Sequence, residues 1–116
     1  MGLVLFVSAL LLLSAVSARA QGKLKVFVLA GQSNMEGAGQ IRINPKNKNG
    51  GKGSLEYLVR DPGTAKRFAH TVNKDGSWRV RDDVWIWYVG RKGGLSVGYG
   101  AKTRMIGPEF QLGHVL

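Results

Sequence analysis

The sequence of 116 residues predicts an α/β fold in which a buried parallel strand is followed by short helices and a small β-hairpin. Residues 24–30 (LKVFVLA) form a continuous apolar run rich in β-branched residues, typical of a strand buried on both faces of a parallel sheet. Helix-capping residues and a Gly-containing turn follow further along the chain. With 44% hydrophobic residues, the chain is too apolar for intrinsic disorder, and its length allows one compact domain at most.

Residues 1–20 have the pattern of a secretory signal peptide. The apolar run 3–16 is shorter than the roughly 20 residues that span a bilayer, and Ala18 and Ala20 form an A-x-A cleavage pattern. A membrane anchor is the alternative, because the first two residues carry no Lys or Arg. We expect cleavage after Ala20, a secreted or periplasmic product, and no stable membrane insertion after cleavage.

Two short helices are expected after a long loop. Residues 37–53 are rich in Gly, Asn and Lys, and loops of that length are usually functional or mobile. Ser54 is expected to cap a helix over 54–59, which Asp61-Pro62 ends. A second short helix is expected over 62–70.

The second half of the chain is expected to form a hairpin and to begin one further helix. Strands are predicted at 77–81, 84–89 and 95–99, the last two separated by a turn at 92–94. Pro108 suits the first position of a helix, and Glu109 is favourable near the positive end of the helix dipole.

The chain is strongly basic, with a formal net charge of +10 at pH 7. Without residues 1–20, the remaining 96 hold 16 basic and seven acidic residues, a charge of +9. The cations are scattered, with no run of four and no recognition-helix or RNA-binding signature. We therefore expect a solvated basic surface and no nucleic-acid partner, while attraction of an acidic polysaccharide remains open.

Several kinds of site are excluded by composition and spacing. The absence of cysteine excludes a disulfide scaffold, a zinc ribbon, an iron–sulfur site and a thiol nucleophile. The stretch 50–54 has Gly53 where a phosphate loop needs Ser or Thr, and Gly37-Ala38-Gly39 fails as a dinucleotide fingerprint. We expect no metal and no cofactor.

The most informative residues follow the expected first strand. Gly31 allows a tight turn, and Ser33 then stands at the carboxyl end of that strand, where ligands bind in open α/β sheets. A serine there can act as a nucleophile, and its amide can point at a developing oxyanion. The motif is not the G-x-S-x-G elbow of the α/β-hydrolases, because Met35 occupies the position of the second glycine. The alternative is that Ser33 only caps a helix.

Residues 26–37 (VFVLAGQSNMEG) closely resemble the nucleophile block of the SGNH-hydrolase superfamily, in the branch with sialate O-acetylesterase-like proteins and carbohydrate esterase family six. Residues 106–110 (IGPEF) look like a second block of that branch. The resemblance implies a flavodoxin-like three-layer α/β fold and hydrolysis of acyl esters, typically acetyl groups on sugars. It makes Ser33 the nucleophile and its amide part of the oxyanion hole. Supporting roles at the oxyanion site fall to Gly31, Gln32 and Asn34.

The chain departs from that family in lacking the Asp-x-x-His that supplies the base and its orienter. Arg67 stands three residues before His70, and Gln111 three before His114. Five parallel strands with crossover helices, at about 30 residues per step, also need well over 96 residues. We therefore expect residues 21–116 to be the N-terminal part of a longer esterase domain, with an incomplete parallel sheet, a small β-hairpin insertion and almost no activity alone.

Other chemically capable residues have ordinary structural interpretations. Asp82 and Asp83 are expected at a turn or strand edge, and His70 at the surface. His114 is expected in the core or in contact with solvent, and Glu109 at the start of a helix. Alternation puts Trp85 and Trp87 on one face of their strand, where aromatic packing is expected and a sugar-stacking platform is the alternative. The alternative function is accordingly a non-catalytic secreted domain that binds carbohydrate or a polyanion.

Overall fold

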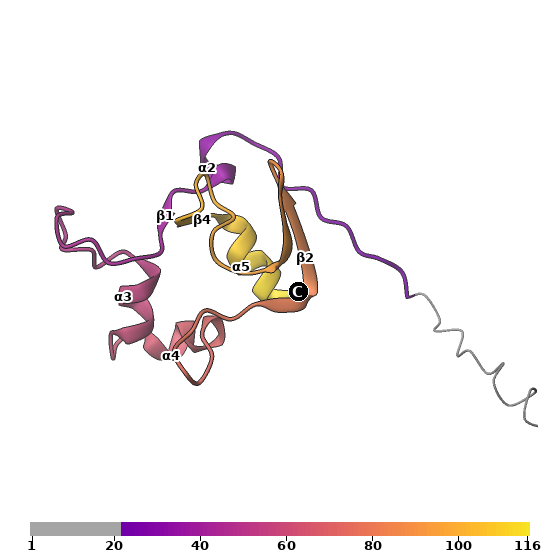
Figure 1. Ribbon diagram of the computed structural model, residues 1–116. Helices are drawn as coiled ribbons and strands as arrows, with labels where there is room; N and C mark the ends of the chain where they lie inside the picture. The colour runs from indigo at the N-terminus through magenta and orange to yellow at the C-terminus, as the bar shows by residue number, and fades with distance from the viewer. Residues whose placement is uncertain (1–21) are drawn as a thin grey trace, which may run out of the picture.

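The computed structural model describes residues 22–116, which form a small mixed α/β domain (Figure 1). The elements in chain order are α2 (Ser33–Glu36), β1 (Gly39–Gln40), α3 (Leu55–Arg60), α4 (Ala65–Phe68), the 3-10 helix η1 (Ala69–Thr71), β2 (Arg81–Tyr88), β3 (Arg91–Leu95), β4 (Met105–Ile106) and α5 (Pro108–Val115). The predicted α/β class is therefore confirmed at this level. The predicted signal peptide, residues 1–20, lies outside the described residues, and none of the helices within them is long and apolar enough to cross a membrane.

The described strands form two small sheets, and both are antiparallel. In one, Gly39 of β1 lies opposite Ile106 of β4. In the other, β2 and β3 form a hairpin in which Tyr88 pairs with Arg91 and Arg81 pairs with Leu95. The parallel sheet predicted from the sequence is not present among residues 22–116.

The N-terminal segment (residues 22–30), predicted to include a buried strand, has neither helix nor strand structure and runs outward from α2 (Figure 1). Within the described part of the chain, its backbone makes no hydrogen bond. The side chains of Leu24, Val26 and Val28 are 88%, 74% and 84% exposed. The apolar pattern is present, but a strand needs a neighbouring strand to bond with, and no described segment supplies one.

A hairpin forms, but with other bounds than predicted: its turn is earlier, and its second strand is β3 rather than 95–99. The predicted strand at 77–81 is wrong, since it has only an isolated bridge from Trp78 to Val72 and the first residue of β2. Val89 and Gly90 make the turn with φ values of 44° and 77°, the left-handed pair that a two-residue hairpin requires. The expected turn at 92–94 belongs instead to β3. Its glycines permit close approach, since a Cβ on Gly94 would lie 2.6 Å from the carbonyl oxygen of Arg81.

The helix boundaries largely follow the local signals. Ser54 caps α3 as predicted, because its Oγ accepts a hydrogen bond from the amide of Tyr57 at 3.3 Å. The next helix starts at Ala65 rather than Pro62, because the Asp61 carboxylate accepts bonds from the Gly63 amide and the Thr64 hydroxyl and stabilises a turn. Helix α5 begins at Pro108, as the sequence predicts.

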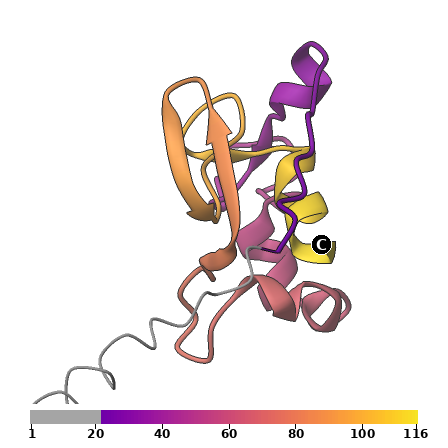
Figure 2. The ribbon, with the colours of Figure 1, turned by 90° about the vertical axis from the view of Figure 1, so that its right-hand side faces the viewer.

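The core is small and joins the hairpin to α5. Leu95 of β3 is 1% exposed and contacts α5 so closely that a Cβ on Gly113 would lie 2.3 Å from a Leu95 methyl group. Phe110 and Leu55 are also buried. Figure 2 shows the hairpin beside α5, with α3 and α4 below them. The core thus anchors β3, and the loop that follows β3 contacts Gly37, just after α2.

Candidate functional site

Ser33 is the first residue of α2 and its side chain is exposed. The N-cap of α2 is Gln32, whose carbonyl accepts bonds from the amides of Met35 and Glu36 at 2.7 and 3.2 Å. No side chain caps this helix. The capping alternative for Ser33 is therefore wrong, and its hydroxyl stands at the surface directly after the N-terminal segment.

The three neighbours predicted to support Ser33 are also exposed: Gly31, Gln32 and Asn34. Gly31 has a steric role, since a Cβ there would lie 2.6 Å from Cγ of Met35. The glycine thus lets the Met35 side chain fold back over the start of the helix. Gln32 and Asn34, on either side of Ser33 in the chain, are polar and exposed.

The two sequence blocks that resemble one family lie against each other in space. Gly37, just after α2, has φ 74°, and a Cβ added to it would lie 2.0 Å from Cα of Gly107. The amide of Ala101 donates to the carbonyl oxygen of Gly37 at 2.9 Å. The close approach of Gly37 to Gly107, called the Gly37–Gly107 contact below, joins the Ser33 block to the start of α5 (Figure 1).

Two carboxyl groups flank the Gly37–Gly107 contact. The hydroxyl of Tyr88 donates to Glu36 Oε1 at 3.2 Å, and burial, reinforced by the charge of Glu36, raises the pKa of Tyr88. Glu109 Oε1 accepts from the amide of Gly107 at 2.8 Å. Burial raises the pKa of Glu109, although that backbone bond opposes the rise. Glu109 thus has the structural role at the helix start that the sequence predicts.

Arg91 fixes the loop that contacts Gly37. Its guanidinium donates to the carbonyl oxygens of Gly98 and Gly100, the latter at 2.6 Å, and lies 5.2 Å from the centre of the Tyr88 ring. Sequence reasoning missed Tyr88, Arg91 and Gly100 as supports of the Ser33 block. The close approach of Gly100 to the carbonyl oxygen of Gly37, 2.8 Å from an added Cβ, is visible only in the structure.

The two histidines form a separate cluster at the other end of α5. Their rings lie 5.1 Å apart, and His70 Nε2 lies 3.3 Å from Gln111 Oε1. His114 is in the last turn of α5, about 10 Å along the helix from Gly107 at 1.5 Å per residue. Burial, then the positive charges of His70 and Arg81, lower the pKa of His114. The cluster lies away from Ser33 and supplies it with no base.

The remaining candidates divide between an ion pair and an open aromatic face. Arg81 binds Asp83 through two nitrogens at 2.8 and 2.6 Å and lowers the pKa of that carboxyl, so Asp83 is structural as predicted. Trp85 and Trp87 share one face of β2, but the expected aromatic packing is wrong, since each is 69% exposed. The hairpin packs through its opposite face, where Ile86 is partly buried.

Among residues 22–116, no three His, Asp or Glu side chains are grouped so as to hold a metal ion. A scan against protein families and searches of curated proteins and of solved structures found no match to this chain.

Proposed function

We propose that the chain is the N-terminal part of a secreted serine esterase of the SGNH type that removes acetyl groups from carbohydrates. The observation that carries the proposal is the exposed Ser33 hydroxyl, which does not cap α2, within a Gly-Gln-Ser-Asn-Met block. The packing of this block against residues 106–109 supports it, because the two stretches that resemble one family are adjacent in space.

In the proposed reaction, Ser33 Oγ attacks the carbonyl carbon of the acetyl ester while a histidine takes the hydroxyl proton. The negative charge that forms on the carbonyl oxygen is met by the Ser33 amide, because the first amides of a helix have no acceptor within it. The sugar oxygen leaves with the proton from the histidine. Water then hydrolyses the acyl-enzyme and releases acetate.

The histidine must come from residues outside this sequence. His70 and His114 are held at the far end of α5, and no Asp-x-x-His occurs among the 116 residues. A general base typically contributes about 10² to 10⁴-fold to the rate, so this chain alone is expected to be nearly inactive.

The finer fold follows from the same proposal. In the longer protein, the N-terminal segment becomes a strand of a flavodoxin-like parallel sheet that residues outside this sequence complete, and the β2–β3 hairpin is an insertion. The unpaired backbone of residues 22–31 and the exposed apolar side chains at Leu24, Val26 and Val28 support this reading. Neighbouring strands on both edges would satisfy its backbone groups, and helices over both faces of the sheet would bury its side chains.

The test measures hydrolysis of p-nitrophenyl acetate by the longer protein that the proposal requires. Ser33→Ala should abolish turnover without loss of folding, because the side chain is exposed. Ser77→Ala makes the same chemical change at another exposed serine and should leave turnover unchanged. Equal turnover by the Ser33→Ala protein would refute the nucleophile assignment.

A second candidate function is supported by the open face of β2. Two tryptophans side by side and 69% exposed on a basic protein offer a stacking surface for a carbohydrate. In that case the protein is a non-catalytic binder, retained on an acidic polysaccharide and released by Trp85→Ala. Retention of this kind without esterase activity in the longer protein would favour the binder over the esterase.

A further inference from the structure

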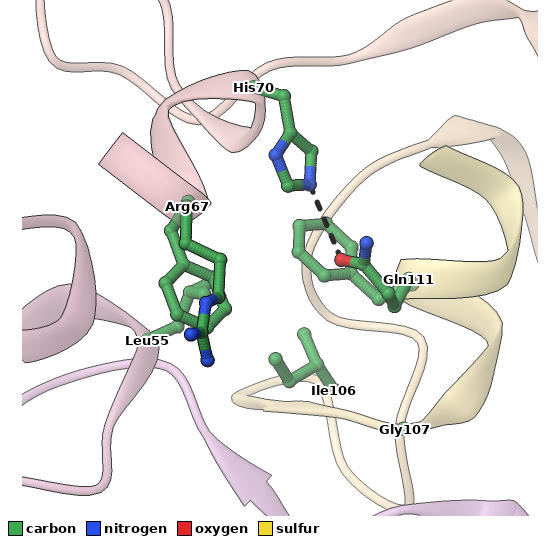
Figure 3. Close-up of a pocket in the computed structure, with 8 residues that line it drawn as sticks. Leu55, Arg67, His70, Ile106, Gly107 and Gln111 are labelled. Atoms are coloured by element: carbon green, nitrogen blue, oxygen red, sulfur yellow. Dashed lines mark hydrogen bonds between the residues drawn. The ribbon is translucent and has the colours of Figure 1, made fainter. Parts of the chain in front are cut away.

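A cavity of about 340 Å³ lies between the pair α3–α4 and the start of α5 (Figure 3). Its walls are mainly apolar and come from four different elements: Leu55, Phe68, Ile106 and Phe110. Two of these, Leu55 and Phe110, are core residues, 3% and 2% exposed. The walls thus belong to the packed part of the domain. None of residues 31–37 lines the cavity, so it is distinct from the Ser33 site.

The polar groups of the cavity lie on two facing sides. His70 Nε2 and Gln111 Oε1, 3.3 Å apart, connect η1 with α5 across it (Figure 3). Arg67 extends along the same side as Leu55. It is the one lining residue with a fixed charge, no carboxylate lines the cavity, and no ion pair of Arg67 occurs among residues 22–116.

This arrangement has the features of a small-molecule site. Ligand pockets of about 300 to 1,000 Å³ are typically apolar, with a few polar groups that fix orientation. An arginine is suited to a carboxylate, which it binds through two parallel hydrogen bonds. The guanidinium of Arg67 beside an apolar cavity therefore complements a molecule with one anionic end and a hydrocarbon body.

We propose that this cavity binds a small apolar monocarboxylate, with the hydrocarbon against Leu55, Ile106 and Phe110 and the carboxylate at Arg67. The positive charge of residues 21–116, which is +9, favours the approach of such an anion. The proposal uses no residue of the Ser33 block and needs no esterase activity, although Ile106 and Phe110 belong to the second block that resembles the SGNH family.

The test is a titration with octanoate, followed by NMR of the methyl groups of the isotope-labelled protein. Octanoate at millimolar concentration should shift the Leu55 and Ile106 methyl signals. Octanamide, which has the same shape without the charge, should bind about 10-fold more weakly. Arg67→Gln should weaken octanoate binding about 10-fold and leave octanamide unchanged. Lys66→Gln, a neighbouring exposed cation on α4 that does not line the cavity, should change neither.

Three results would overturn the proposal. Equal affinity for octanoate and octanamide would remove the role of charge, as would unaltered octanoate binding by the Arg67→Gln protein. Shifts confined to the N-terminal segment would show that octanoate binds the exposed apolar chain and not the cavity. Arg67 is exposed, so its substitution is not expected to disturb folding, and each of these results can be read directly.

Discussion

Replacing Gly37 by alanine should strongly destabilise the domain, because this glycine is required both by its backbone and by its neighbour. Its φ and ψ of 74° and 124° are unfavourable for a residue with a Cβ, at a cost of about 1–2 kcal/mol. The added Cβ would also lie 2.0 Å from Cα of Gly107, which cannot yield without moving the start of α5. Such overpacking costs about 1–3 kcal/mol. Together the two effects predict a loss of about 2–5 kcal/mol.

The assay is urea unfolding followed by circular dichroism, with Gly76→Ala as the matched control. Gly76 has a similar φ of 81°, but no heavy atom lies within 4 Å of the place where its Cβ would be. Its substitution should therefore cost only the backbone strain, about 1–2 kcal/mol. If the two variants lost the same stability, the close packing of the Ser33 block against Gly107 would be refuted.

Three further predictions concern other parts of the domain. Ser54→Ala should lower the free energy of unfolding by about 1–2 kcal/mol in urea, since it removes the cap of α3 and a buried bond to Gly51; an unchanged value would contradict the capping role. Because burial lowers the pKa of His114 in the folded protein, the free energy of unfolding should fall as the pH drops below about 6.5, the pKa of His114 in the unfolded chain. His114→Gln should flatten that part of the pH–stability curve, and an identical curve would exclude His114 as its source. Trp85→Ala should change stability by no more than about 0.5 kcal/mol in thermal unfolding, because the side chain is 69% exposed; a larger loss would mean that the tryptophan packs in the fold.

Local signals predicted the starts of α3 and α5 but not that of α4, which begins at Ala65 and not at Pro62. The Ser54 cap and Pro108 at the start of α5 each depend on a residue and its immediate neighbours, so sequence alone determines them. The position of the hairpin turn was missed because Val89, a β-branched residue, adopts a φ of 44° beside Gly90. Lys92-Gly93-Gly94 looked more like a turn, but its glycines accommodate the close approach of the opposite strand.

Non-local features were harder to predict. The apolar run in the N-terminal segment indicates burial but cannot identify the strands that would pair with it or the helices that would cover it, and no strand pairs with it in residues 22–116. Alternation placed the two tryptophans on one face of β2, while the choice of buried face depends on α5, which packs on the other side. At the candidate site, Ser33 was found from its motif. The contact of Tyr88 required the fold, because its partner Glu36 is distant in sequence. Arg91 bonds to nearby residues, but the path of the loop that holds Gly98 and Gly100 was not predicted.

The claim that Ser33 is a nucleophile is tested most directly by the position of a covalent label. The longer protein would be treated with a fluorophosphonate, which reacts with activated serines, and digested with trypsin. Cleavage after Lys25 and Arg42 isolates Ser33 as the one serine of peptide 26–42. The account predicts the label on that peptide, and its loss in Ser33→Ala. A label on another serine, or none in a protein that hydrolyses p-nitrophenyl acetate, would contradict it.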